Sequence, residues 1–167
     1  MKKRTITAAM AALALLALTP GVRADDGLIT EKVLPLKFEL EAAQAIIQAC
    51  AAKNFHVSVV IVDAYGNTKV SLVSDGAIYT TADSARRKAY TAAMMRRSTA
   101  ELQAQIAANP GAPQPGDGNP VFLFLAGGLP IRIGSEVVGG IGVGGAASQQ
   151  DAECAQAGID RIQSMVH

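Results

Sequence analysis

The sequence is poor in the residues that most often carry metal or nucleic-acid chemistry. It has no tryptophan, only two histidines and two cysteines, and 4% aromatic residues in a chain of 167. No CxxC pair occurs and the histidines are not neighbours, which excludes a zinc site built on cysteine or on a histidine cluster. A formal net charge of +1 lacks the basic footprint of a nucleic-acid-binding protein. We therefore expect no nucleic-acid partner.

Motifs for nucleotide binding and for nucleophilic catalysis are missing as well. The glycines at 142–145 do not have GxGxxG spacing, and no GK[ST] follows them. His56 comes just before a predicted strand, with no nucleophile signature near it, so a Ser-His-Asp triad is not indicated. No residue pattern demands an enzyme, and we predict no catalytic residue.

The N-terminus has the pattern of a secretory signal peptide. Three basic residues at 2–4 precede an apolar run over 8–18, and small residues precede a cut after Ala24. That run is too short for a bilayer, which a helix crosses with about 20 residues. We expect residues 1–24 to be removed, a periplasmic or secreted location, and no integral membrane segment afterwards. The loss of four basic residues would change the net charge to about −3.

The rest of the chain predicts a flexible arm over 25–35 and a single domain over 36–167. Apolar periodicity predicts helices over 38–53, 80–97, 98–108 and 149–165. β-branched runs predict strands over 57–62, 68–74, 121–125, 129–133 and 137–143. Short turns make neighbouring strands antiparallel. The fold class is therefore α+β, with a five-stranded antiparallel sheet flanked by helices in the order α-β-β-α-α-β-β-β-α.

Glycine is concentrated in the last predicted strand and in the loop after it, at positions 139, 140, 142, 144 and 145. Glycine weakens a strand, and the usual reason for it is the close approach of another backbone or of a flat ligand. Residues 148–151 then predict a capping box at the start of the last helix. The free N–H groups of that helix end suit an anionic ligand group.

Four motifs together resemble a known family. They are VSVVIVD at 57–63, DGA at 75–77, KAYTA at 88–92 and GGLPIRIGSEVVGGIGVGGAASQQDAECAQAGI at 127–159. They are similar to the haem-binding and haem-degrading-domain family. It includes extracellular haem-binding sensor proteins, the glycolate-operon protein G group and the C-terminal domain of PduO-type corrinoid adenosyltransferases. The resemblance covers about residues 36–162 and implies a profilin-like sandwich that binds haem or a related tetrapyrrole.

The resemblance directs attention to residues that could hold haem. His56 is a candidate iron ligand through its imidazole, and its alternative role is that of a surface residue in a helix–strand turn. Tyrosine and methionine also ligate iron. The candidate set for iron, propionates and ring is His56, Tyr79, Arg86, Lys88, Tyr90, Met94, Met95, Gly142, Gly144 and Gly145. Lys88 has a structural alternative, a buried contact with Asp63 or Asp75 that fastens the first hairpin to the second helix.

Cys50 and Cys154 both fall in predicted helices. In an exported protein they are able to form a disulfide, and they are equally able to be two small buried thiols. The residues alone leave both alternatives open.

These observations favour an exported haem- or tetrapyrrole-binding module that acts in sensing, storage or transport. The alternatives are a haem-degrading enzyme and a ligand-free accessory protein of a periplasmic redox system. An alanine-faced helix and a glycine strand also suit close protein–protein contact, so we expect a homo-oligomer.

Overall fold

The computed structural model describes residues 30–111 and 118–166, and the compact unit starts at Glu31. The predicted signal peptide and residues 25–29 of the predicted arm lie outside the described residues. The part of the arm inside them belongs to the compact unit, because Leu34 is buried in the core and Lys32 pairs with Glu136 at 3.1 Å. The elements, in chain order, are α1 (Leu36–Ala51), β1 (Ser58–Asp63), β2 (Thr68–Val73), α2 (Thr81–Met95), α3 (Thr99–Ala108), β3 (Gly128–Ile133), β4 (Glu136–Gly144) and α4 (Ser148–Met165).

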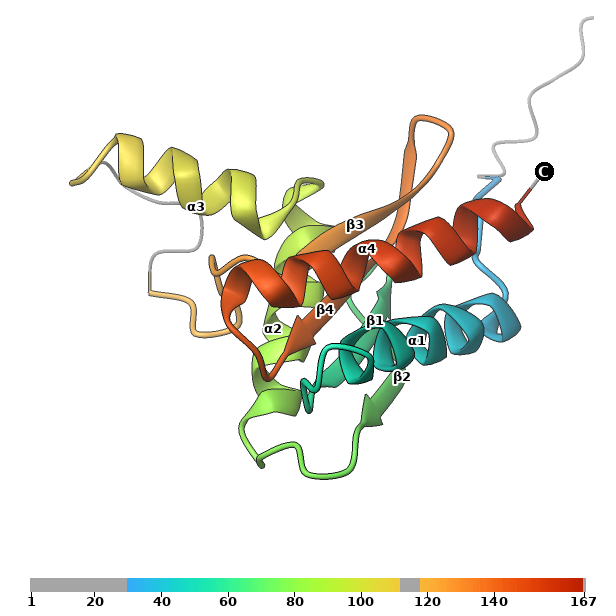
Figure 1. Cartoon of the computed structure of the whole chain (residues 1–167). Coiled ribbons are helices and arrows are strands. Elements are labelled where there is room, and N and C mark those ends of the chain that lie inside the picture. The colour runs from blue at the N-terminus through green and yellow to red at the C-terminus, as the bar shows by residue number, and fades with distance from the viewer. Residues whose placement is uncertain (1–29, 112–117, 167) are drawn as a thin grey trace, which may run out of the picture. The chain divides into compact units, whose positions relative to one another are not determined.

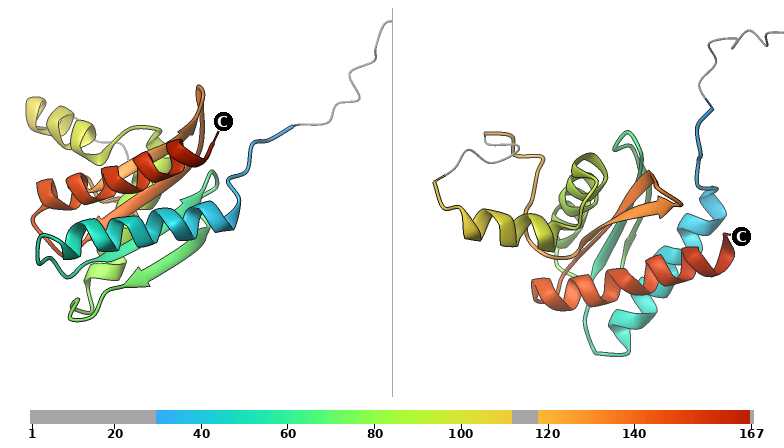
Figure 2. Two further views of the ribbon diagram at one scale, coloured as in Figure 1. Left: turned by 45° about the vertical axis from the view of Figure 1, so that its right-hand side comes forward. Right: turned by 90° about the horizontal axis from the view of Figure 1, so that it is seen from above.

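The four strands form one antiparallel sheet in the order β2-β1-β4-β3. Helices α1 and α4 lie side by side on one face of this sheet, and α2 covers the other face (Figures 1 and 2). The α+β class is therefore confirmed.

Two separate cores hold these layers together. The larger core joins α1 and α4 to one face of the sheet through aliphatic side chains such as Ile46, Ile141 and Ile162. The smaller core joins α2 to the other face and is built from Val60, Val62 and a row of alanines on the helix. Small residues on α2 bring that helix unusually close to the strands.

The strand predicted over 121–125 is wrong, so the described sheet has four strands and not the predicted five, and the described elements follow the order α-β-β-α-α-β-β-α. Side chains of the neighbouring helices take up the backbone groups of this segment. The Leu123 N–H donates to Thr91 Oγ1 at 2.9 Å, and Arg87 Nη2 donates to the Phe122 carbonyl at 2.9 Å. The Ala126 N–H donates to Gln103 Oε1 at 3.2 Å. The segment lies against α2 and α3 instead of adding to the sheet.

Capping boxes are predicted at the starts of α3 and α4, and only the first is observed as predicted. Ser98 and Glu101 form the predicted capping box at the start of α3. Helix α4 has Ala147 at its N-cap position, with no side-chain cap. The predicted box at 148–151 is wrong because Ser148 is already inside the helix. The Ala147 N–H donates to Gln150 Oε1 at 3.2 Å, and the Ala146 N–H donates to Asp151 Oδ1 at 3.0 Å.

Candidate functional site

His56 lies in the connection between α1 and β1. Asn54 has a φ of +59°, and the Phe55 N–H donates back to the Cys50 carbonyl at 3.0 Å, which closes the end of the helix. The chain then turns into the strand, leaving the His56 side chain exposed. His56 is therefore held between two rigid elements although it belongs to a connecting segment.

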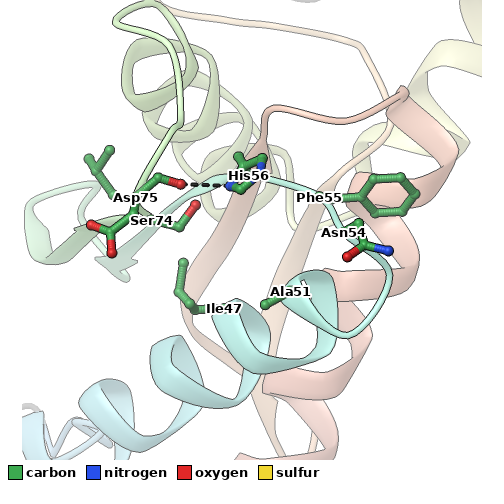
Figure 3. A pocket seen from close by; sticks show the side chains of 8 residues that line it. Ile47, Ala51, Asn54, Phe55, His56, Ser74 and Asp75 are labelled. Atoms are coloured by element: carbon green, nitrogen blue, oxygen red, sulfur yellow. Dashed lines mark hydrogen bonds between the residues drawn. The ribbon is translucent and has the colours of Figure 1, made fainter.

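One imidazole nitrogen of His56 has a fixed partner. Nδ1 lies 2.6 Å from the backbone carbonyl oxygen of Asp75 (Figure 3). A carbonyl oxygen only accepts hydrogen bonds, so Nδ1 carries the proton and donates it. In the neutral ring the lone pair then resides on Nε2. This is the arrangement in which a histidine offers Nε2 to a metal while its other nitrogen is held by an outer hydrogen bond.

A cavity of about 450 Å³ opens beside His56. Figure 3 shows the end of α1 on one side of it and the turn after β2 on the other. Its lining is mainly apolar with a few polar groups, the usual character of a small-molecule site. The lining residues are Ile47, Ala51, Asn54, Phe55, His56, Val73, Ser74 and Asp75.

A second cavity of about 470 Å³ continues the first along α1 and β2. The two share Ile47, Val73 and Ser74, and the second adds Gln44, Gln48 and Leu72. We call the two cavities together the α1–β2 groove. It offers a flat apolar ligand a wall on each side and an imidazole at one end.

The predicted role of Lys88 as a ligand-binding residue is wrong. Its side chain is 2% exposed, and Nζ donates to Asp151 Oδ2 at 2.7 Å and to the Val143 carbonyl at 2.9 Å. The structural alternative named the wrong partner as well, because neither Asp63 nor Asp75 contacts this lysine. Asp63 instead accepts hydrogen bonds from Tyr65 and Asn67 in the β1–β2 turn. Lys88 thus fastens α2 to the start of α4.

The glycines of β4 meet a backbone instead of a ligand. A Cβ on Gly142 would lie 1.9 Å from the Ala85 carbonyl oxygen, and one on Gly144 would lie 2.8 Å from that of Thr81. Both oxygens belong to α2, so the predicted ligand contact of these two glycines is wrong. Gly145 has a φ of +138°, and its Cβ would lie 2.4 Å from the His56 carbonyl oxygen. Gly145 therefore lies behind His56 and not in the groove.

The other candidates do not gather around His56. Tyr90 packs on Phe122, with ring centroids 5.5 Å apart, and its ring covers Gly66. Met94 also approaches Gly66, which comes after β1, whereas His56 comes before β1. Six strand residues span about 20 Å, so Tyr90 and Met94 are too distant to share a ligand atom with His56. None of Tyr79, Arg86 and Met95 lines the groove.

Arg86 and Tyr79 remain at the surface. Arg86 Nη2 pairs with Asp83 at 2.9 Å on the same helix, and Tyr79 is 97% exposed in the segment before α2. No lysine or arginine lines the α1–β2 groove. Arg86, a candidate for binding the haem propionates, is therefore not part of this groove.

Cys50 and Cys154 form a disulfide with their Cα atoms 5.6 Å apart. It joins the last turn of α1 to the first half of α4. An ion pair between Lys53 and Glu153, at 2.8 Å, lies at the same place. These contacts hold the end of α1, which supplies Ala51 to the groove and precedes Phe55.

Sequence reasoning found His56 but missed what surrounds it. The sequence patterns place Ile47 in a helix, Phe55 in a turn and Val73 in a strand, and they give none of the three a role in binding. The Asp75 carbonyl is a backbone group, and no side-chain motif identifies such a group. In the sequence, only the following glycine, Gly76, indicates the sharp turn that contains it. In the described parts of the chain, no three histidine, cysteine or acidic side chains are arranged to hold a metal ion. Nor is any described helix long and apolar enough to cross a membrane.

A family model described as "Haem degrading protein HbpS-like" matches residues 34–160. The chain belongs to this HbpS-like family. A curated relative from Citrobacter freundii, an uncharacterised 15.0 kDa protein of the dhaT-dhaS intergenic region, is 34% identical over 128 residues, which are 72% of this chain and 89% of the relative.

Solved structures of the family share the fold. A double mutant of Streptomyces reticuli HbpS has a TM-score of 0.74 at 36% identity, covering 93% of this chain and 97% of its own. Klebsiella pneumoniae ORFY has a TM-score of 0.76 at 25% identity, covering 83% and 97%. A PduOC:heme complex has a TM-score of 0.72 at 26% identity, covering 78% and 95%.

Proposed function

We propose that this HbpS-like protein binds haem in the α1–β2 groove, with His56 Nε2 as an axial ligand of the iron. The observation that carries the proposal is the hydrogen bond from His56 Nδ1 to the Asp75 carbonyl, which leaves Nε2 as the electron-pair donor. The groove beside it has apolar residues on both sides, such as Ile47 of α1 and Val73 of β2. A relative of this fold was solved in complex with haem, and the family description names haem.

The groove fits the ring of haem better than its propionates. Ile47, Phe55 and Val73 provide apolar surface, and Asn54 and Gln44 provide amides at the edges. Without a lysine or arginine in the lining, the propionates would point to solvent, where water satisfies them. We therefore expect the iron–imidazole bond and the apolar contacts to supply most of the affinity.

We further propose that the protein is exported and acts in haem sensing, storage or transport. The N-terminal pattern of basic, apolar and small residues supports export. The disulfide between Cys50 and Cys154 suits an oxidising compartment such as the periplasm or the cell exterior.

Homo-oligomerisation remains a proposal, but it now rests on a different surface from the one that the sequence indicated. The alanine face of α2 and the glycines of β4, from which it was expected, meet each other inside one chain. Exposed apolar side chains occur instead near the groove, where Val73, Ile78 and Tyr79 are 56%, 69% and 97% exposed. A second copy covering this surface would also cover the groove.

The experiment is a haem titration of the purified protein followed at the Soret band. The variant is His56→Ala, and the control is His167→Ala, which removes the second of the two histidines. We expect a saturable Soret band in wild type and control, and at least a tenfold weaker affinity in His56→Ala, which corresponds to about 1.4 kcal/mol. An equal affinity in all three proteins would contradict His56 ligation, and no specific band in any of them would contradict haem binding.

The family description favours haem degradation as a second candidate function. Ring opening requires dioxygen and a reductant in addition to haem. A reductant in air can also open the ring of haem that is merely bound, but only once per binding site. Incubation with excess haem, a reductant and catalase in air would therefore yield several open-chain tetrapyrroles per protein if the protein is an enzyme. A Soret band that decays no faster than that of free haem would support simple binding.

A further inference from the structure

The carbonyl that holds His56 belongs to a tight turn of a definite type. The Ala77 N–H donates to the Ser74 carbonyl at 3.1 Å, which closes a four-residue β-turn with Asp75 and Gly76 in the centre. Gly76 has a φ of +79°, whereas Asp75 is not among the residues with positive φ. Positive φ at the third position alone defines a type II turn.

The type of turn decides where the Asp75 carbonyl points. Types I and II differ mainly in ψ of the second residue and φ of the third, which turns the central peptide group over. That central peptide contains the Asp75 carbonyl. In the type II form observed here this oxygen meets His56 Nδ1 at 2.6 Å, so in a type I turn it would point to the opposite side.

Gly76 meets two requirements at this position. Its positive φ is one that residues with a Cβ rarely adopt. A Cβ there would also lie 3.2 Å from His56 Nδ1 and 3.4 Å from His56 Cγ, so the side of the glycine that lacks a side chain is turned toward the imidazole. Both the backbone conformation and the space beside the ring therefore favour glycine.

The turn is fixed to the segment that carries His56. The Ser74 N–H donates to the Val57 carbonyl at 3.0 Å, and the Val57 N–H donates to Ser74 Oγ at 2.8 Å. Gly145 approaches the His56 carbonyl from the other side. The imidazole and the carbonyl that it bonds are thus attached to the same rigid pair of strands.

We propose that Gly76 is a positioning residue that holds His56 in the tautomer with a proton on Nδ1. The type II turn that Gly76 permits aims the Asp75 carbonyl at Nδ1, and Nε2 of this groove-lining histidine is thereby left as the electron-pair donor. The consequence for ligands is a preference for metalloporphyrins with an open axial position over metal-free porphyrins. The consequence for haem rests on the proposed function, while the tautomer itself does not.

The first test needs no haem. Long-range ¹⁵N–¹H NMR of the ¹⁵N-labelled protein, at a pH at which the ring is neutral, distinguishes the protonated nitrogen of His56 from the bare one. We expect the Nδ1–H tautomer to dominate in wild type and in Asp75→Ala, which keeps the backbone carbonyl. In Gly76→Ala we expect a mixture of the two tautomers. A dominant Nε2–H tautomer in wild type would overturn the proposal whether or not any variant folds.

Gly134→Ala provides the matched control for backbone strain. Gly134 also has a positive φ, +66°, and a Cβ there would meet only Lys32 Nζ at 3.9 Å, far from His56 in the sequence and in the sheet. We expect it to lose stability as Gly76→Ala does but to keep the wild-type tautomer. If Gly76→Ala also keeps that tautomer, the positioning role is wrong.

The second test is the binding of haem and of metal-free protoporphyrin. We expect Gly76→Ala to bind haem about tenfold more weakly than Gly134→Ala, and to bind the metal-free ring equally well. Loss of both ligands to the same extent would indicate a deformed groove and contradict the positioning role. If the tautomer is as expected but wild type binds neither ring, the turn positions His56 and the proposed function is wrong.

Discussion

At the scale of single residues, two buried carboxyl groups have very different surroundings. Asp151 bonds to Lys88, whereas Glu39 is 3% exposed and its Oε2 has no hydrogen-bond partner in the described structure. Glu39 lies beside a cavity of about 70 Å³, which Asp63 and Lys69 also line. Burial raises the pKa of Glu39, Lys69 lowers it and Asp63 raises it further, so the net direction is upward.

The raised pKa predicts how stability depends on pH. Because folded Glu39 binds its proton more tightly than unfolded Glu39 does, its contribution to stability is greatest below the ordinary value of 4.5 and falls as pH rises through the raised value. Glu39→Met removes the buried charge. We expect Glu39→Met to exceed wild type in unfolding free energy by a larger margin at pH 7 than at pH 4, measured in urea.

Glu41→Met on the same helix is the control. Its carboxylate is exposed and pairs with Arg161, and such surface pairs contribute about 0–1 kcal/mol. We expect its effect to be nearly the same at the two pH values. A pH-independent effect of Glu39→Met would show that Glu39 is ionised to the same degree in the folded and unfolded chains.

At the scale of elements, the glycines of β4 determine how closely α2 approaches the sheet. Gly140 and Gly142 allow the carbonyls of Ala89 and Ala85 to touch the strand, since Cβ atoms there would lie 2.3 and 1.9 Å from these oxygens. The glycines of β4 are therefore explained by the close packing of α2 on the sheet.

Gly142→Ala should be strongly destabilising because backbone atoms, unlike a flexible side chain, cannot move aside. We expect a loss of about 3 kcal/mol in unfolding free energy, at the upper end of overpacking costs. Gly118→Ala, with φ +75° and nothing within 4 Å of its Cβ, should cost about 1 kcal/mol through backbone strain. Equal losses in the two variants, measured by urea unfolding, would contradict the packing role.

Local patterns predicted most elements but not their partners. The β-branched run before Asp63 and the Ser98–Glu101 capping box each have one physical interpretation, and both are observed. The glycines of β4 had two interpretations, a ligand and a backbone, which no local pattern separates. The segment 121–125 has strand-forming residues, and only the distant side chains of Thr91 and Arg87 divert it from the sheet. His56 was identifiable by its chemistry, whereas its carbonyl partner depends on tertiary structure.

At the scale of the whole molecule, the disulfide joins distant parts of the chain beside the groove. Helices α1 and α4 run antiparallel, with Cys50–Cys154 at one end of the pair and Glu41–Arg161 toward the other (Figure 2). The cysteines are 104 positions apart, and closing so long a loop restricts the unfolded chain strongly.

Replacing both cysteines by serine should lower the unfolding free energy by about 2–5 kcal/mol. The same loss should follow when wild type is unfolded in dithiothreitol, and the reductant should leave the double variant unchanged. Urea unfolding with and without reductant makes this comparison. A wild type that is as stable when reduced as when oxidised would show that the bridge contributes nothing to folding.

The bond between His56 and haem iron is tested most directly by resonance Raman spectroscopy of the ferrous haem complex. We predict an iron–histidine stretching band that shifts on ¹⁵N-labelling of histidine, persists in His167→Ala and is absent from His56→Ala. The same band in His56→Ala, or its absence from wild type with haem bound, would contradict the assignment of His56 as the iron ligand.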